Sequence, residues 1–403
     1  MPKSKTPVFT VLGGAGAMGS ITVRDLIETA PAEAQIWIAD ANIEKAQALV
    51  KAHKRKGLKA VQVNMQEPAA LVKALKGTQV LLNSLPYEFN LQVMEFALEL
   101  GAHYTDLGGL FHMTRKQVAL HEAFEKAGLT ALMGIGAAPG ITNLLAKLAA
   151  DPMESVHSID ILLGAIDKTK YNFKQILPVS YSFKTILEEF SLQPAVFKKG
   201  KYRFLKPMSG LKAYRFPAPV GQQYPMYTLH SEIYNLAETY KAKGIEEVSF
   251  KIAFDKDFVE KVRFLRDLGL ASPEAISFAE GQVAPIDLLN SVVMNQPVPE
   301  AITEPKQYEI LRVIVKGKEQ GKRITWINDL HTAGLPAWGI GTDIDTGSPP
   351  SIAAQMLLAG EITERGVCPP EKAIKAEPFF QALEKRGMHI HSSRKPGWAT
   401  PVG

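Results

Sequence analysis

Four glycines stand close together near the start of the chain, where backbone atoms could take part in binding. The stretch VLGGAGAMGS covers residues 11–20 and contains the spacing G-x-G-x-x-G, from Gly14 through Gly16 to Gly19. After a predicted strand and before a predicted helix, this spacing is typical of a loop that holds a dinucleotide pyrophosphate. Gly14 would permit the tight turn, Gly16 a close backbone approach to phosphate, and Gly19 close packing of the helix on the sheet.

The residues around these glycines refine the expected ligand. The free N–H groups of Ala17 and Met18 at the helix N-terminus would face the phosphate charge. Asp40 ends the second predicted strand, 21 residues after Gly19, where a carboxylate accepts hydrogen bonds from the adenosine ribose and repels a 2′-phosphate. The sequence therefore predicts NAD as the cofactor, with NADP less favoured. Asp40 as the cap of the next helix is the structural alternative, and it is compatible with this role.

Two further segments follow predicted strands and should lie on the same edge of the sheet. They are NSLPYEFN at residues 83–90 and DLGG at residues 106–109. Ligands of open parallel sheets bind outside the carboxyl ends of the strands. The residues expected to contact the cofactor there are Asn83, Ser84, Leu85, Pro86, Asp106 and Gly108. Tyr87 would lie nearer the reacting ring, although each of these residues could instead have a purely structural role.

The elements that must position these residues alternate regularly over the first 150 residues. Strand-like runs at 7–13, 35–40, 60–64, 79–84, 103–108 and 130–136 are separated by segments with helical periodicity. Thr114 and Gln117 fit a capping box that opens a helix running to Lys126. Short connections between alternating strands and helices predict an α/β fold, a Rossmann-type doubly wound parallel sheet.

The pattern changes after about residue 158, where strand-like runs alternate more and lie further apart. We expect a Rossmann NAD-binding domain at residues 1–145, completed by residues 345–403. Residues 146–344 would form an inserted α+β domain. The final helix-like segments each begin with proline and are followed by glycine, as is typical of helix ends. We expect them to pack on the first domain.

Composition excludes several classes of protein. The 403 residues include 46 basic and 41 acidic side chains, a mild net charge of +5 that does not suggest a nucleic-acid partner. The single cysteine, Cys368, cannot form an internal disulfide. No signal peptide or long apolar run is evident, so we expect a cytoplasmic protein that does not associate with membranes. The nine histidines show no metal-ligand spacing, so no metal is expected.

Three segments together resemble the saccharopine dehydrogenase family. They are SLPYEFNLQVMEFALELGAHYTDLGG at 84–109, GIGAAPGITNLLA at 134–146 and AAQMLLAGEITERGVCPPEKAI at 353–374. The resemblance implies a Rossmann protein whose inserted α+β domain binds substrate and forms a homodimer. It also implies NAD(P)-dependent oxidation or formation of a C–N bond at an amine of an amino acid or polyamine.

The family resemblance leaves several activities open. Ala138 precedes Pro139 and Gly140, where fungal saccharopine reductases have an aspartate, and this form looks more like lysine 6-dehydrogenase. Oxidative deamination of the lysine ε-amine through an imine is therefore the first expectation. Saccharopine dehydrogenase or carboxynorspermidine dehydrogenase activity on a secondary amine is the alternative. A protein that binds NAD without catalysis, as a sensor, is the alternative from a different class.

Oxidation of an amine implies further residues. An alkylammonium must lose a proton before hydride can leave, so the site needs a general base. His230 is the candidate, with Glu232 to orient it if both share one face of a strand. Tyr87 could hydrogen-bond the amine, while Arg215 and Lys184 could bind a substrate carboxylate. Each of these side chains has a structural alternative in the core or on the surface.

Overall fold

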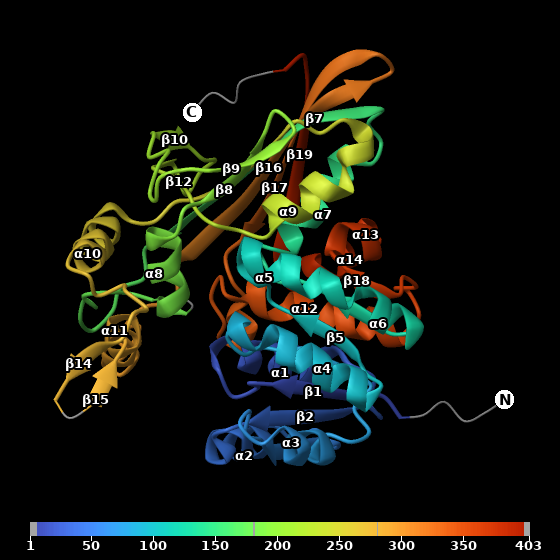
Figure 1. Ribbon diagram of the computed structural model, residues 1–403, viewed down its shortest axis with the longest axis vertical. Helices are drawn as coiled ribbons and strands as arrows, with labels where there is room; N and C mark the ends of the chain where they lie inside the picture. Colours follow the sequence, from blue (N-terminus) through green and yellow to red (C-terminus); the bar gives the residue numbers. More distant parts are fainter. Residues whose placement is uncertain (1–5, 180–181, 280, 399–403) are drawn as a thin grey trace.

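The computed structural model describes residues 6–179, 182–279 and 281–398, and most of its strands lie in two large β-sheets. Figure 1 shows the sheets as separate layers, with the blue N-terminal strands of the first sheet at the bottom. No helix in the described part of the chain is long and apolar enough to cross a membrane.

The first sheet has seven strands in the order β18-β6-β5-β4-β1-β2-β3, and all of its pairs are parallel. Its strands are β1 (Val8–Leu12), β2 (Gln35–Asp40), β3 (Leu58–Gln62), β4 (Val80–Asn83), β5 (His103–Asp106), β6 (Thr130–Leu132) and β18 (Gly366–Cys368). The strand order reverses between β1 and β4, the point at which such sheets bind nucleotides. The predicted doubly wound parallel sheet is therefore confirmed.

Helices cover both faces of this sheet. They include α1 (Ala17–Thr29), α2 (Ile43–Ala52), α3 (Pro68–Ala74), α4 (Asn90–Leu100), α5 (Leu110–Gln117) and α6 (His121–Lys126). Successive strand residues point to opposite faces. Val11 of β1 thus belongs to one apolar core with Leu26 of α1, whereas the adjacent Leu12 belongs to a second core with Val93 of α4. Burial on both faces explains why the central strands β1 and β4 are mostly apolar.

The second sheet is mixed, with eight strands in the order β19-β17-β16-β7-β13-β8-β9 and β12 paired to β13. Only the β7–β13 pair is parallel. The strands are β7 (Ser155–Asp167), β8 (Ala195–Lys198), β9 (Lys201–Phe204), β12 (Met226–Tyr227), β13 (Glu247–Ile252), β16 (Gln307–Glu319), β17 (Lys322–Thr332) and β19 (Met388–Pro396). Helices α7 (Ile141–Ala150) and α9 (Glu232–Thr239) pack on it.

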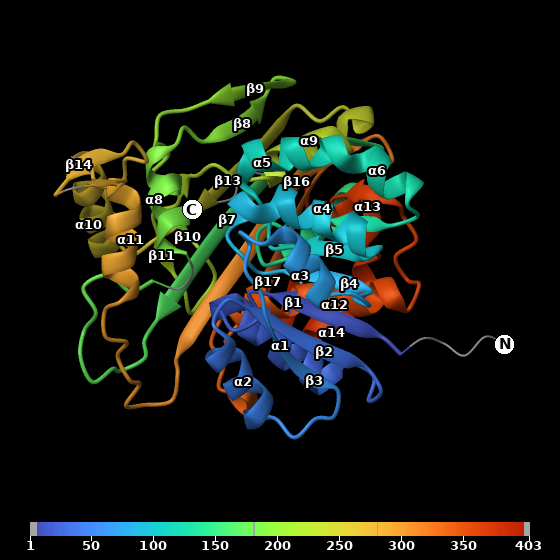
Figure 2. The ribbon, with the colours of Figure 1, turned by 60° about the horizontal axis from the view of Figure 1, so that its bottom comes forward.

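A smaller group of helices lies at one end of the second sheet (Figure 2). It contains α8 (Phe183–Ser191), α10 (Lys256–Asp267), α11 (Pro285–Met294) and the hairpin of β14 (Ile276–Phe278) and β15 (Gly281–Val283). Phe183 and Phe190 of α8 share an apolar core with Phe258 of α10 and Ile286 of α11. A separate ribbon is formed by β10 (Tyr214–Arg215) and β11 (Gln222–Gln223).

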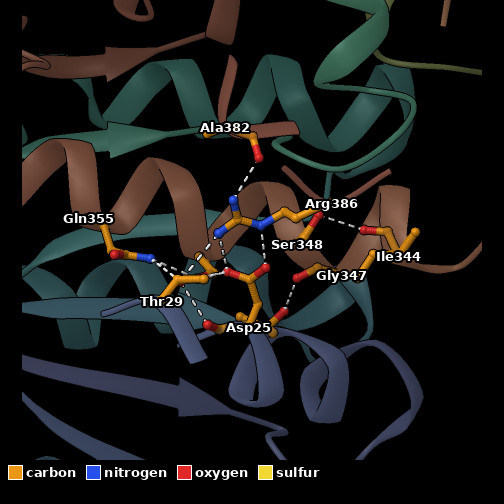
Figure 3. Close-up of polar contacts among 10 residues, drawn as sticks. Asp25, Thr29, Ile344, Gly347, Ser348, Gln355, Ala382 and Arg386 are labelled. Atoms are coloured by element: carbon orange, nitrogen blue, oxygen red, sulfur yellow. Dashed lines mark hydrogen bonds and ion pairs between the residues drawn. The ribbon is translucent and has the colours of Figure 1, made fainter. Parts of the chain in front are cut away.

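The chain returns to the first sheet through α12 (Ile344–Leu358), β18, α13 (Pro370–Ala373) and α14 (Ala376–Glu384). Figure 3 shows how the return is fixed: Arg386 forms a buried ion pair with Asp25 of α1. Ser351 of α12 donates a hydrogen bond to the same carboxylate at 2.5 Å. A Cβ on Gly347 would lie 2.4 Å from Cβ of Ile21, so glycine is required for the close packing of α12 on α1.

Two details of the sequence prediction need correction. The C-terminal segment does not remain with the first sheet, because β19 pairs with β17 at the edge of the second. The helix expected to start at the capping box of Thr114 and Gln117 instead starts at Leu110, and the Thr114 hydroxyl donates to the Leu110 carbonyl inside α5. The division at residues 145 and 344 stays a prediction as a domain boundary.

Candidate active site

The glycine loop joins β1 to α1 and has little room for side chains. Gly13 has a φ of +75°, a left-handed conformation that favours glycine, so the tight turn is made by Gly13 rather than by Gly14 as predicted. A Cβ on Gly14 would lie 2.9 Å from the Val11 carbonyl oxygen, and a Cβ on Gly19 would lie 2.1 Å from the Gly13 carbonyl oxygen. Gly19 therefore lets α1 pack on the loop itself.

The remaining glycine leaves space for a ligand. A Cβ on Gly16 would meet only the Gly13 carbonyl oxygen, at 3.1 Å, among the described atoms within 4 Å. Gly16 is the N-cap of α1, the helix has no side-chain cap, and its first turn holds no acidic residue. The first N–H groups of a helix, here from Ala17, Met18 and Gly19, lack partners within the helix. This cradle fits a pyrophosphate, and the cofactor would supply the group that accepts or donates hydride.

Asp40, at the end of β2, is hydrogen-bonded to the glycine loop. Its Oδ2 atom accepts a hydrogen bond from the backbone N–H of Ala15 at 2.9 Å, and its Oδ1 atom accepts one from Asn42 at 2.9 Å. The side chain is partly exposed, which leaves lone pairs for ribose hydroxyls. Its role in selecting NAD stays a prediction.

Asn83 and Asp106 point into the protein and hold the loops after β4 and β5. Asn83 accepts from the Leu85 N–H at 3.1 Å and donates to Asn90 at 2.9 Å. The buried carboxylate of Asp106 accepts hydrogen bonds from four groups: the N–H of Gly108, the N–H of Gly134, the hydroxyl of Tyr104 and the amide of Gln117. These two side chains fix loops, whereas backbone atoms of Ser84, Leu85, Pro86 and Gly108 remain the candidates for direct cofactor contact.

The loop with the Ala-Pro-Gly segment packs against the loop after β5. A Cβ on Gly108 or on Gly134 would lie 2.6 Å from Cγ of Pro139, so both glycines are needed for this contact. A Cβ on Gly140 would lie 2.2 Å from the Gly136 carbonyl oxygen. The conspicuous glycines of DLGG and GIGAAPG thus keep the two loops together at the edge where a ligand would bind.

Tyr87 contacts a glutamate that the sequence analysis missed. Tyr87 lies in a short 3-10 helix (Tyr87–Phe89) just after β4, and its hydroxyl donates to Oε2 of Glu188 on α8 at 3.0 Å. Burial raises the pKa of Glu188 to about 7, against the lowering effect of the Tyr87 hydrogen bond. Burial and Glu188 also raise the pKa of Tyr87. The pair therefore offers a carboxyl group that can exchange a proton near neutral pH.

His230 and Glu232 form the second acid–base pair. Nδ1 of His230 lies 2.7 Å from Oε2 of Glu232, and the imidazole stacks on the Phe250 ring with centroids 3.7 Å apart. Burial lowers the pKa of His230, but Glu232 and Glu189 outweigh it, so the net shift is upward. Glu232 is the first residue of α9 and also accepts from the Thr142 hydroxyl at 2.9 Å. The contact thus comes from a loop and a helix start, not from one strand face.

Helix α8 connects the two pairs. Glu188 faces Tyr87, while the next residue, Glu189, lies with Oε1 3.9 Å from Nε2 of His230. Two adjacent glutamates in the otherwise uncharged run TILEEFSL were the signal in the sequence for this role. Glu189 is only 3% exposed. Few glutamates are buried in this way unless they have a partner.

The two candidates for binding a substrate carboxylate differ. Lys184 lies one turn before Glu188 on α8, with Nζ 3.2 Å from Glu88 and 3.1 Å from Asp287. Arg215 is exposed on the β10–β11 ribbon, and within the described part of the chain no hydrogen bond or ion pair links it to the other candidates. The structure brings Lys184 to the Tyr87–Glu188 pair, and binding of a carboxylate by either residue stays a prediction. Residues 6–179, 182–279 and 281–398 contain no cluster of histidine, cysteine and acidic side chains that could hold a metal ion.

Comparison with known proteins is consistent across the chain. Residues 9–132 match the family model described as the saccharopine dehydrogenase NADP binding domain, and residues 136–388 match the saccharopine dehydrogenase C-terminal domain. A carboxynorspermidine synthase of Vibrio cholerae is 24% identical, covering 93% of this chain and 94% of that protein. A carboxyaminopropylagmatine dehydrogenase of Synechocystis is 23% identical, covering 94% of this chain and 96% of that protein.

Solved structures support the same fold. Saccharopine dehydrogenase (L-Glu forming) from Saccharomyces cerevisiae superposes with a TM-score of 0.72 at 18% identity, covering 97% of this chain and all of that one. Homospermidine synthase from Legionella pneumophila, solved in complex with NAD, has a TM-score of 0.68 at 12% identity and covers 97% of this chain and 92% of that one. Because the two matched domains span nearly the whole chain, the protein belongs to the saccharopine dehydrogenase family of NAD(P)-dependent amine oxidoreductases.

Proposed function

We propose that the protein oxidises or forms the C–N bond of a secondary amine that carries a carboxylate, with NAD as the hydride carrier. The Tyr87–Glu188 pair carries the proposal, because it provides a proton acceptor with a pKa of about 7 beside the end of β4. Relatives that align over nearly the whole chain are named for carboxynorspermidine and carboxyaminopropylagmatine, which supports a carboxylated amine as the substrate.

The chemistry assigned to these residues follows from the substrate. In the oxidative direction the secondary ammonium first gives its proton to Glu188, and the amine carbon then loses hydride to the cofactor. The resulting iminium ion takes up water, its C–N bond breaks, and a carbonyl compound and a primary ammonium are released. The Tyr87 hydroxyl stabilises the ionised form of Glu188, and Nε2 of His230 lies 3.9 Å from Oε1 of the neighbouring Glu189.

Oxidation of the lysine ε-amine was the first expectation from the sequence. None of the relatives named above is a lysine 6-dehydrogenase, and they favour the secondary-amine alternative. A sensor that only binds NAD would have no use for a partly buried acid–base pair just after β4.

A spectrophotometric panel tests the proposal. The purified protein is incubated with NAD at alkaline pH and with lysine, ornithine, saccharopine or carboxynorspermidine, and the absorbance of NADH is followed. We expect a signal with carboxynorspermidine or saccharopine and none with the primary amines. A signal with lysine alone would select the first expectation instead, and a flat trace for all four compounds would reject the secondary-amine class.

A further inference from the structure

Three carboxyl side chains outside the pairs described above lie where the second sheet meets the first. Glu309 is on β16, and Asp343 and Asp345 lie at the start of α12. The segment before α12 is tied to β16, because the Thr342 N–H donates to Gln307 Oε1 at 3.3 Å. In the described part of the chain no lysine, arginine or histidine pairs with these carboxyls, and they act on one another. We call them the α12 carboxyl cluster.

One carboxylate oxygen of this cluster lacks a partner that its burial would require. Asp345 is 2% exposed, and its Oδ2 atom has no hydrogen-bond donor among the described residues, while Oδ1 accepts from Thr346 at 3.2 Å. Asp343 occupies the N-cap position of α12, yet its side chain makes no capping hydrogen bond. Buried polar atoms are nearly always hydrogen-bonded, so a donor from outside the chain is expected here.

The cluster lies at the edge of the first sheet where the cofactor site is. The Thr346 methyl is 3.5 Å from the position of a Cβ on Gly136, in the loop after β6. A Cβ on Gly347 would lie 3.3 Å from the Met18 carbonyl oxygen in the first turn of α1. The first turn of α12 thus sits between the helix that follows the glycine loop and the loop after β6. A substrate that reacts with the cofactor must lie close to this edge.

We propose that Glu309, Asp343 and Asp345 bind an alkylammonium group of the amine substrate, separate from the nitrogen that reacts. This inference rests on the proposed function. An ammonium group brings three hydrogen-bond donors and one positive charge, which the unpartnered Asp345 oxygen and its two neighbours lack. Among the described residues no group of three such side chains could coordinate one metal ion, so Asp345 would hydrogen-bond the ammonium directly and Glu309 and Asp343 would contribute negative charge.

The charge state of the cluster agrees with such a ligand. Burial, followed by repulsion from Asp343, raises the pKa of Glu309 to about 7, and burial raises the pKa of Asp343 to about 6. Burial, together with both neighbours, raises the pKa of Asp345 as well. A bound ammonium offsets this repulsion and favours the ionised carboxylates.

Calorimetric titration of the NAD-loaded protein with 1,3-diaminopropane at pH 8 tests the inference without turnover. We expect binding to the wild type, and binding weakened by about tenfold or more in Asp345→Asn and in Glu309→Gln. The matched control is Glu304→Gln, an exposed carboxylate in the segment just before β16, which should bind the diamine as the wild type does. 1-Propanol, which has no charge, should not bind.

The outcome is interpretable even if one variant does not fold. A thermal unfolding measurement identifies a variant that does not fold. If Asp345→Asn is that variant, diamine binding to Glu309→Gln, at a partly buried position, tests the inference on its own. Absence of diamine binding to the wild type would overturn the inference, as would equal binding to the wild type and the folded variants. Failure of the proposed function looks different: no secondary amine is turned over, while diamine binding still depends on Asp345 and Glu309.

Discussion

At the scale of single residues, the acid–base chemistry depends on Tyr87 and Glu188, which are 101 positions apart in the chain. Neither residue is unusual in its local sequence. Burial and contact give Glu188 a proton affinity suited to an amine substrate, and the same burial keeps Tyr87 protonated as a hydrogen-bond donor. The proposed catalytic property therefore depends on the contact between the turn after β4 and α8.

The first prediction concerns the pH dependence of this pair. Burial raises the pKa of Glu188 to about 7, so its proton is lost, and activity rises, as the pH increases through about 7. Glu188→Gln should lower kcat by about 100-fold. It should also abolish the rise of activity near pH 7, the acid limb of the pH–rate profile. Tyr87→Phe should move the limb to higher pH, because the Tyr87 hydrogen bond lowers the pKa of Glu188.

A matched control exists in the same chain. Glu238 accepts a hydrogen bond from the Tyr202 hydroxyl at 2.9 Å, the same kind of pair outside the site. Glu238→Gln should leave the profile unchanged. An unaltered acid limb in Glu188→Gln would remove Glu188 from the mechanism.

The second prediction concerns cofactor choice at Asp40. Its carboxylate would repel a 2′-phosphate, so kcat/KM should be higher with NAD than with NADP. Asp40→Asn retains an oxygen that can accept the hydrogen bond now made to Oδ2 by the Ala15 N–H at 2.9 Å, and it removes the charge. We expect this variant to gain relative efficiency with NADP in steady-state assays. Equal or better efficiency of the wild type with NADP would contradict the assignment.

At the scale of elements, the glycine loop determines how α1 starts and where its N–H groups point. Gly19 permits contact between the helix and the loop, whereas Gly16 leaves open space in front of the helix. The first is a packing requirement and the second a binding requirement, although both belong to one short motif.

The third prediction separates these two requirements. Gly19→Ala should lower the free energy of unfolding by about 1–3 kcal/mol, because its Cβ would lie 2.1 Å from a backbone oxygen. Gly16→Ala should unfold at nearly the wild-type temperature and still bind NAD at least about tenfold more weakly, because the methyl group would obstruct the pyrophosphate. Thermal unfolding and a fluorescence titration with NAD measure both. Equal NAD affinity in folded Gly16→Ala would mean that phosphate binds elsewhere.

Local patterns in the sequence predicted the first sheet well and the acid–base site only in part. The glycine spacing and the apolar strands are signals within a few residues, and the His230–Glu232 contact spans two. Glu188 was missed because its partner comes from a distant turn. The C-terminal residues were expected on the first domain, and the pairing of β19 with β17 was missed because strand pairing is set by long-range contacts. The capping box at Thr114 was wrong because α5 already begins at Leu110, after Gly109.

At the scale of the whole molecule, the two sheets are joined by contacts that also form the candidate sites. Tyr87 is hydrogen-bonded to Glu188 of α8, the segment before α12 is hydrogen-bonded to β16, and α12 packs on α1. The Asp25–Arg386 ion pair secures the C-terminal return far from these sites in the sequence (Figure 3).

The fourth prediction is the oligomeric state. The family resemblance led to the expectation of a homodimer, and large apolar side chains are exposed on α10 and on the β14–β15 hairpin, where Phe264 is 65% and Phe278 is 61% exposed. Light scattering should give twice the 44.1 kDa mass of one chain. Phe264→Ser with Phe278→Ser should shift it toward the monomer, whereas Leu148→Ser on α7, 37% exposed, should not. A monomeric wild type would contradict the expectation.

Identification of the released amine tests the central claim most directly. Carboxynorspermidine is incubated with NAD and the wild-type protein, and the nitrogen-containing products are identified by mass spectrometry alongside an ammonia assay. We predict stoichiometric release of a primary diamine with NADH, no ammonia, and almost no product with Glu188→Gln. Release of ammonia, with lysine as the better substrate, would contradict the assignment to a secondary amine.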